Sequence, residues 1–149
     1  MIAIIDYNAG NITSVARALQ NIRQKFIITD DMKKLDKASR VIFPGVGAAG
    51  EAMAYLREKK LDVWLKNYFK TGKPLLGICL GTQIILDYSE ENETICIGLV
   101  SGSTKRFPDK LTSEGELLKI PQMGWNSVKL LRSHPLFEGV SPEAEFYFV

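Results

Sequence analysis

The first half of the sequence alternates short apolar runs with segments of helical periodicity. The apolar runs cover residues 2–5, 25–29, 40–43 and 74–78. Runs of this length and composition are typical of buried parallel strands. Strands that alternate with helices are joined by right-handed crossovers, and the helices then cover both faces of the sheet. The sequence therefore predicts an α/β fold with an open, mostly parallel sheet.

Three helices are predicted from their apolar spacing and their boundary residues. Asn11 is a favourable N-cap for the first helix, whose apolar positions recur at helical spacing across residues 12–22. The second repeats apolar residues at helical spacing across 61–68, and Gly72 provides its stop. The third is expected to run from Leu80 towards Asp87, directly after the last apolar run.

The strands change character along the chain. Pro44 lacks an N–H group and is expected to end the third strand at Phe43, because it cannot continue a central ladder. Beyond residue 94 the predicted strands are short, at 95–100, 125–130 and 145–149, and Gly, Pro and Ser separate them. The last of these is an apolar run without a polar tail, which favours a core strand and suggests that late strands of the sheet are missing from this chain.

Composition limits the classes of protein that this chain can belong to. Its 149 residues are 46% hydrophobic and 24% charged, enough for one core, so we expect a single domain over residues 1–149. A net charge of +2 without a basic run gives no support for nucleic acid as a partner. No signal peptide or membrane span is evident. Cys79 and Cys96 form neither a disulfide framework nor a metal motif, so we expect a cytoplasmic protein without cofactor or metal.

The strongest local motif is Gly77-Ile78-Cys79-Leu80-Gly81, between a predicted strand and a predicted helix. This is the context of a nucleophile elbow, where the two flanking glycines leave room for a sharp turn. A thiol at a helix N-terminus has its thiolate favoured, and the N–H of Leu80 would face an oxyanion formed at the sulfur. The alternative is a buried cysteine that only packs, which is the interpretation we give to Cys96.

A second motif, Phe43-Pro44-Gly45-Val46-Gly47-Ala48, directly follows the third strand. In open α/β sheets, ligands bind beyond the carboxyl ends of the strands, so this loop and the cysteine turn are expected to share one crevice. A glycine-flanked loop can aim backbone N–H groups at a negative oxygen. The alternative is a tight turn between strand and helix. No phosphate-binding motif is present.

Four motifs together resemble one branch of the class I glutamine amidotransferases, the subunits of imidazole glycerol phosphate synthases. The cysteine elbow is common to the class, whereas the first and last motifs point to this branch. The resemblance extends over nearly the whole chain and implies a flavodoxin-like sheet. The motifs are Asp6-Tyr7-Asn8-Ala9-Gly10-Asn11, Pro44-Gly45-Val46-Gly47, Gly77-Ile78-Cys79-Leu80-Gly81-Thr82-Gln83 and Gly124-Trp125-Asn126.

The resemblance implies a role for each matching residue. Cys79 would attack the side-chain amide of glutamine, release ammonia and hold a glutamyl thioester. The N–H groups of Val46 and Leu80 would bind the oxyanion. Ammonia would pass to a (β/α)8-barrel cyclase in a heterodimer, for imidazole glycerol phosphate formation in histidine biosynthesis. The residues implied to bind glutamine are Gly45, Gly47 and Gln83, and those implied to lie near the cyclase are Asn11, Met123 and Trp125.

The sequence departs from the family in its proton-transfer residues. Family members carry a His and a Glu in a late F-H-P-E-like segment, which does not occur here. The single histidine, His134, lies in a turn-like stretch, and we interpret it as a solvated or capping residue rather than the base. The sequence is therefore interpreted as an amidotransferase domain truncated before that segment, with little glutaminase activity as it stands.

Three alternatives remain open at this point. The first is an amidotransferase that feeds a different synthase, for example in a cell-surface sugar pathway. A peptidase or thioesterase on a similar sheet is a second enzyme class, which Gln83 and the loop at 44–47 disfavour. The third alternative is a non-catalytic fragment that retains only partner binding, and the absent His and Glu favour it.

Overall fold

The computed structural model describes residues 1–7, 11–113 and 115–149. These residues form two compact units, Met1–Arg106 and Phe107–Val149. Residues Asn8, Ala9 and Gly10 of the first family motif lie outside the described residues.

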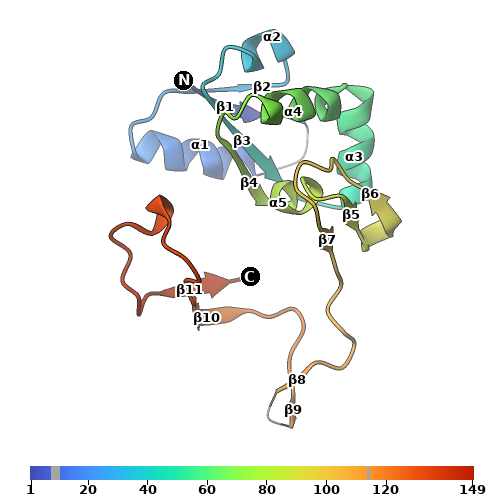
Figure 1. The fold of residues 1–149 in the computed structure, drawn as a ribbon, viewed down its shortest axis with the longest axis vertical. Coiled ribbons are helices and arrows are strands. Elements are labelled where there is room, and N and C mark those ends of the chain that lie inside the picture. Colours follow the sequence, from blue (N-terminus) through green and yellow to red (C-terminus); the bar gives the residue numbers. More distant parts are fainter. Residues whose placement is uncertain (8–10, 114) are drawn as a thin grey trace. The chain divides into compact units, whose positions relative to one another are not determined.

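A parallel sheet of four strands forms the centre of the first unit (Figure 1). Its strands are β1 (Ile2–Ile5), β2 (Phe26–Thr29), β3 (Arg40–Gly45) and β4 (Leu75–Cys79), in the spatial order β2-β1-β3-β4. This order is the flavodoxin-like arrangement, in which the crossover direction reverses between β1 and β3. The predicted fold class is confirmed.

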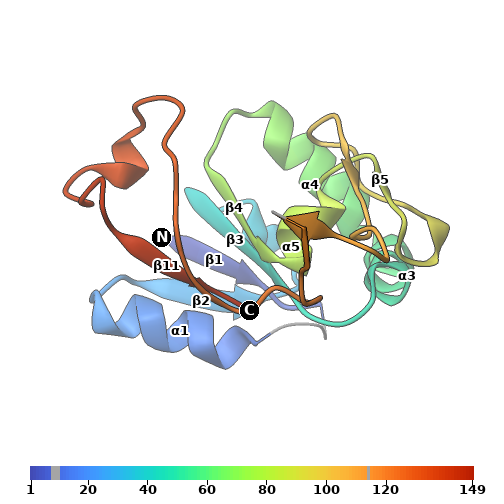
Figure 2. The ribbon, with the colours of Figure 1, turned by 90° about the horizontal axis from the view of Figure 1, so that it is seen from below.

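Helices cover both faces of this sheet (Figure 2). Helix α1 (Ile12–Asn21) lies on one face, and α3 (Ala49–Glu58), α4 (Leu61–Lys70) and α5 (Leu80–Ile84) lie on the other. The short α2 (Met32–Leu35) follows β2. Because side chains alternate along a strand, Ile2 and Ile4 pack towards α1, whereas Ala3 and Ile5 pack with α3 and α4.

The helix boundaries agree with the predicted signals. Asn11 caps α1, and its Oδ1 accepts a hydrogen bond of 3.2 Å from the N–H of Ser14. The apolar positions predicted for α4 are buried, including Leu61 and Leu65, which have no exposed surface. Gly72 follows this helix with a left-handed φ of 72°, as a C-terminal stop requires.

Strand β3 corrects the prediction that Pro44 ends it. The strand continues to Gly45, and Pro44 and Gly45 pair with Ile78 and Cys79 of β4. The N–H of Val41 points towards the β4 side, where it donates to Pro74. Successive residues alternate in direction, so Pro44 faces the β1 side, where the described pairing has already ended at Ile42. The missing N–H group therefore costs no ladder hydrogen bond.

The segment after the cysteine turn is more compact than predicted. Helix α5 ends at Ile84 rather than near Asp87, because the N–H of Asp87 donates to Gly102 at 3.0 Å. The predicted strand 95–100 is reduced to β6 (Thr94–Ile95), which pairs with β5 (Tyr88–Ser89). The N–H groups of residues 96–100 instead donate back to carbonyls of residues 84–87. β7 (Ser103–Thr104) completes this small sheet beside η1 (Glu91–Glu93).

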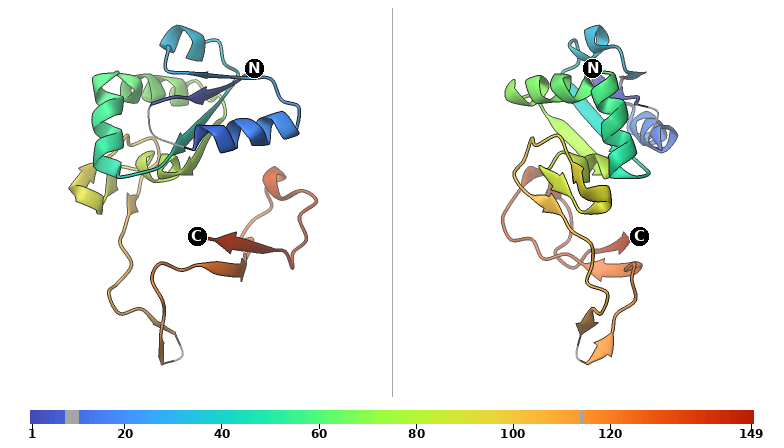
Figure 3. Two further views of the ribbon diagram at one scale, coloured as in Figure 1. Left: turned by 180° about the vertical axis from the view of Figure 1, so that it is seen from behind. Right: turned by 90° about the vertical axis from the view of Figure 1, so that its right-hand side faces the viewer.

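The second unit contains short antiparallel pairs (Figure 3). β8 (Thr112–Ser113) pairs with β9 (Glu116–Leu117), and β10 (Gly124–Ser127) pairs with β11 (Glu145–Phe148). The 3-10 turn η2 (Pro135–Phe137) lies between the last two strands. All four residues of β11 are exposed, so the prediction of a core strand at 145–149 is wrong for this chain as described.

Candidate active site

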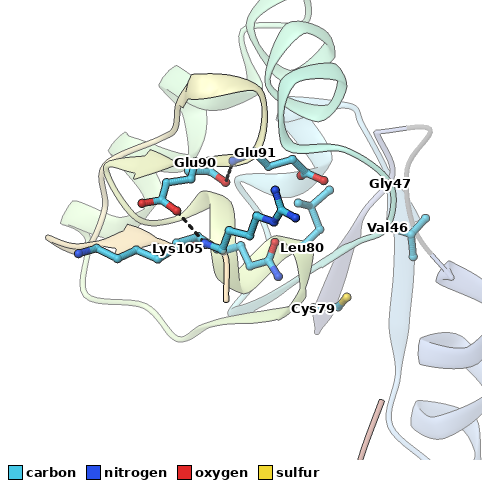
Figure 4. Close-up of a pocket in the computed structure, with 11 residues that line it drawn as sticks. Val46, Gly47, Cys79, Leu80, Glu90, Glu91 and Lys105 are labelled. Atoms are coloured by element: carbon cyan, nitrogen blue, oxygen red, sulfur yellow. Dashed lines mark hydrogen bonds between the residues drawn. The ribbon is translucent and has the colours of Figure 1, made fainter. Parts of the chain in front are cut away.

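A pocket of about 440 Å³ opens at the carboxyl ends of β3 and β4 in the first unit (Figure 4). Its lining includes Val46 and Gly47 from the loop after β3, and Cys79, Leu80 and Gln83 from the turn after β4. The two sequence motifs therefore share one crevice, as their positions after adjacent parallel strands predict. Gly45 is not among the lining residues; it is buried at the end of β3.

The backbone of Cys79 is strained. Its φ of 54° and ψ of −121° lie outside the regions that residues with a Cβ atom favour. Such conformations cost about 1–3 kcal/mol and occur at functional turns. The residue is exposed and ends β4 immediately before α5. It is therefore not a buried packing cysteine, and its thiol is accessible from the pocket.

The glycines on either side of Cys79 are required by close backbone contacts. A Cβ atom on Gly81 would overlap the carbonyl oxygen of Phe43, and one on Gly77 would lie 2.9 Å from the Cα of Thr82. The sharp turn thus brings α5 against the end of β3. This confirms the steric reason predicted for the glycine spacing.

The loop after β3 presents its backbone to the pocket. Gly47 has a left-handed φ of 88°, and a Cβ atom there would meet nothing within 4 Å. Val46 is 47% exposed. Gly45 is paired with Cys79 across the sheet, which brings the beginning of this loop beside the cysteine. The loop thus starts beside the cysteine and forms part of the pocket lining.

Charged residues from a second loop complete the pocket, and the sequence motifs did not identify them. Glu90, Glu91, Lys105 and Arg106 line it together with Ser89 and Thr104. Glu90 accepts a hydrogen bond of 2.8 Å from the N–H of Arg106, which joins the two charged pairs (Figure 4). They lie outside the motifs, and the pairing of β5 with β7 brings the two charged segments together at the site.

Tyr7 lies buried beneath the cysteine turn. Its side chain is 1% exposed, contacts the ring of Phe43 at 5.2 Å between centroids, and has a hydroxyl without a hydrogen-bond partner among the described residues. A Cβ atom on Gly45 would overlap this hydroxyl. Burial raises the pKa of Tyr7 well above its usual range, and the neighbouring Cys79 raises it further. The hydroxyl of Tyr7 therefore stays protonated at neutral pH.

The other singled-out residues are not among those that line this pocket. Cys96 is buried in the core, as predicted. His134 caps η2 in the second unit, where its Nδ1 accepts a hydrogen bond from the N–H of Leu136 at 3.2 Å, so its interpretation as a capping residue is confirmed. Asn11 is exposed at the start of α1. Met123 and Trp125 are exposed in the second unit, and Trp125 packs edge-on against Tyr147.

The described residues contain neither a metal-binding cluster nor a helix that could span a membrane. The described part of the chain has no cluster of three or more His, Cys, Asp or Glu side chains with the geometry of a metal site. Within residues 1–7, 11–113 and 115–149, none of the helices has the length and apolar character needed to cross a bilayer.

A parallel α/β sheet with an exposed cysteine on a strained elbow is the framework of a cysteine-dependent amidotransferase, and comparison with known proteins identifies the class. The chain belongs to the class I glutamine amidotransferase family, whose sequence pattern matches residues 3–148. A crystal structure of a glutamine amidotransferase has a similar fold, with a TM-score of 0.62 and 16% identity. The similar region covers 71% of this chain and 57% of the chain in that crystal structure. This chain therefore spans less than two thirds of the length of that solved chain.

Curated relatives narrow the comparison to one branch of the family. The chain is 51% identical to imidazole glycerol phosphate synthase subunit HisH of Nitratidesulfovibrio vulgaris (strain DSM 19637 / Miyazaki F), over all of this chain and 71% of that protein. It is 47% identical to the HisH subunit of Dehalococcoides mccartyi (strain CBDB1), over all of this chain and 70% of that one. The corresponding subunit of Pseudomonas syringae pv. syringae (strain B728a) is 44% identical, over 99% of this chain and 70% of its own length.

Proposed function

We propose that the pocket hydrolyses the side-chain amide of glutamine, with Cys79 as the nucleophile. The observation that carries this proposal is the strained and exposed backbone of Cys79 at the carboxyl edge of the sheet. Strain of this kind persists only when the surrounding structure enforces it, and here Gly77 and Gly81 allow the close packing that does so. Membership of the class I family supports the same chemistry.

The reaction proceeds through a covalent intermediate. The sulfur of Cys79 attacks the amide carbon of glutamine and forms a C–S bond, and the carbonyl oxygen becomes an oxyanion. The N–H groups of Val46 and Leu80 donate hydrogen bonds to that oxygen. The C–N bond breaks, and the nitrogen leaves as ammonia with the proton that the thiol gave up. Water then breaks the C–S bond of the thioester, which releases glutamate and returns a proton to the sulfur.

Three residues position the substrate in this proposal. Gln83 of α5 and Gly47 of the loop after β3 both line the pocket that contains the thiol, and they would hold the glutamine there. Gly45 acts indirectly, because its missing side chain lets β3 approach Tyr7 and α5.

We further propose that the ammonia is used by a (β/α)8-barrel cyclase subunit, in a heterodimer that forms imidazole glycerol phosphate in histidine biosynthesis. The similarity to HisH subunits over the whole chain supports this partner. The partner would use the ammonia in a lyase reaction that splits its own substrate. Asn11, Met123 and Trp125 are exposed and would contact the cyclase. A catalytic thiol must stay reduced, which supports a cytoplasmic location.

The family pattern spans residues from both compact units, which supports one amidotransferase domain over residues 1–149. We also propose that this chain turns glutamine over slowly by itself, because its single histidine, His134, caps η2 and no histidine lines the pocket. Ammonia release should be far below that of the HisH subunit of N. vulgaris measured alongside it. An equal rate would contradict this proposal.

A diazo ketone analogue of glutamine tests the proposed nucleophile. The analogue should modify the chain once, and peptide mass mapping should place the modification on Cys79. The variant Cys79→Ser should remain unmodified, whereas Cys96→Ser should react like the unchanged chain, since Cys96 is buried in the core. Modification of another residue, or none in the presence of folded protein, would overturn the assignment.

The proposed partner is tested separately by binding. The chain should form a one-to-one complex with the barrel cyclase subunit of a related synthase in sedimentation experiments. Trp125→Ala should weaken that complex, because Trp125 offers a 65% exposed aromatic surface. Val63→Ala, an exposed apolar residue of α4 in the first unit, serves as the control. Binding of a cell-surface sugar synthase in place of the cyclase would reassign the acceptor.

A further inference from the structure

A carboxylate that lines the pocket binds the first residue of the helix that follows the loop after β3. Oε2 of Glu91 accepts a hydrogen bond of 2.7 Å from the N–H of Ala49, the first residue of α3, although the two residues are 42 positions apart. The residue before the helix, Ala48, supplies no side-chain cap. Glu91 therefore takes the place of a local N-cap for a helix of 10 residues.

Glu91 is itself held firmly. Its N–H donates to the hydroxyl of Ser89 at 3.2 Å, and its carbonyl accepts from the hydroxyl of Thr94 at 2.7 Å. Ser89 is completely buried and Thr94 is 7% exposed. The backbone of Glu91 is thus held by hydrogen bonds to two buried side chains, one in β5 and one in β6.

The loop that it caps has little support of its own. Ala49 comes two residues after Gly47, and both Val46 and Gly47 are exposed. Gly47 is in a left-handed conformation with open space around it, so packing does not restrain it. Val46, Gly47, Glu91 and Cys79 all line the same pocket. The hydrogen bond to Ala49 consequently ties the end of the loop to the segment that contains Glu91.

We propose that Glu91 is a positioning residue: by capping α3 from a segment distant in sequence, it fixes the N–H of Val46 relative to the sulfur of Cys79. This inference rests on the proposed glutamine hydrolysis. Oxyanion stabilisation depends on donors that are held in place before the reaction, so a loose loop weakens it without removing the donor. The role needs an acceptor oxygen at this position and does not need a negative charge.

The test compares two variants with two reagents. Glu91→Ala removes the acceptor, and Glu91→Gln retains an acceptor oxygen without the charge. The diazo ketone analogue has a carbonyl that the loop polarises, whereas iodoacetamide alkylates a thiol by displacement at carbon and needs no oxyanion donor. Glu93→Ala removes a charge from the same loop at a residue outside the pocket lining and is the matched control.

Glu91→Ala should lower the maximal rate of modification by the analogue about tenfold, with a small change in the half-saturating concentration. Its iodoacetamide rate at Cys79 should stay within about twofold, which also reports that the turn is folded. Glu91→Gln and Glu93→Ala should both behave like the unchanged chain.

Three results would overturn the inference. Glu91→Ala could react with the analogue as fast as the unchanged chain. Glu91→Gln could react with the analogue as poorly as Glu91→Ala, with the defect seen as a higher half-saturating concentration. The carboxylate would then bind the analogue directly. An equal loss with both reagents would indicate general disruption of the turn. The proposed function is judged separately, since it fails only if the unchanged chain is not modified at Cys79.

Discussion

Replacing Cys79 by glycine should stabilise the fold while it removes the nucleophile. The residue has a φ of 54° and a ψ of −121°, a conformation that costs a residue with a Cβ atom about 1–3 kcal/mol and glycine much less. Glycine also makes the unfolded chain more flexible, which offsets about 0.5–1 kcal/mol of this gain. The thiol is exposed, so little burial is lost. We expect the free energy of unfolding to rise by about 1 kcal/mol.

Urea unfolding monitored by tryptophan fluorescence can measure this effect in the first compact unit, which contains Cys79. The chain has two tryptophans, Trp64 in α4 and Trp125 in β10. A Trp125→Phe background therefore leaves Trp64, which is 7% exposed in the first unit, as the reporter. Cys79→Ser and Cys79→Ala retain a Cβ atom and should be about as stable as the background protein.

The comparison among these variants separates strain from side-chain effects. If Cys79→Ala stabilises as much as Cys79→Gly, the gain comes from removing the thiol, and the backbone is not strained. If Cys79→Gly lowers the free energy of unfolding, the elbow conformation is wrong, and with it the geometric basis for the nucleophile.

Three further predictions concern the surroundings of the turn. Gly81→Ala should lower the free energy of unfolding by about 3 kcal/mol, because the new Cβ atom overlaps the carbonyl of Phe43; a loss below about 1 kcal/mol in urea unfolding would contradict this contact. Tyr7→Phe should be neutral or stabilise by up to about 1 kcal/mol, since it removes a buried hydroxyl without a described partner, and a marked loss in a thermal melt would reveal a missed hydrogen bond. Iodoacetamide should modify Cys79 in the folded chain and Cys96 only after unfolding, because burial shields Cys96 and raises its pKa so that the thiol stays protonated; mass mapping that finds both modified at similar rates would argue against the described core.

Local patterns predicted the sheet and the centre of the site well. Apolar runs and helical spacing are properties of contiguous residues, and they located β1, α4 and the turn at Cys79 correctly. The glycine spacing predicted a steric requirement that the contacts of Gly77 and Gly81 then confirmed.

The remaining features depend on contacts between distant segments, which such patterns do not encode. Pro44 is tolerated inside β3 because the pairing of β3 with β1 ends at Ile42, so no partner on that side needs the missing N–H group. This depends on the register of the sheet. Residues 96–100 do not form a strand because their N–H groups find carbonyls of residues 84–87. Glu91 reaches Ala49 across 42 positions, so its capping role emerges only in the folded chain.

The most direct measurement of the central claim is to trap the covalent intermediate with glutamine itself. The chain is mixed with L-glutamine, quenched in acid and digested, and the peptide that contains Cys79 is analysed by mass spectrometry. A glutamyl group on Cys79 that is absent from Cys79→Ser and from a D-glutamine control is the predicted result. A glutamyl group on another residue, or glutamate released at an undiminished rate by Cys79→Ser, would contradict the account.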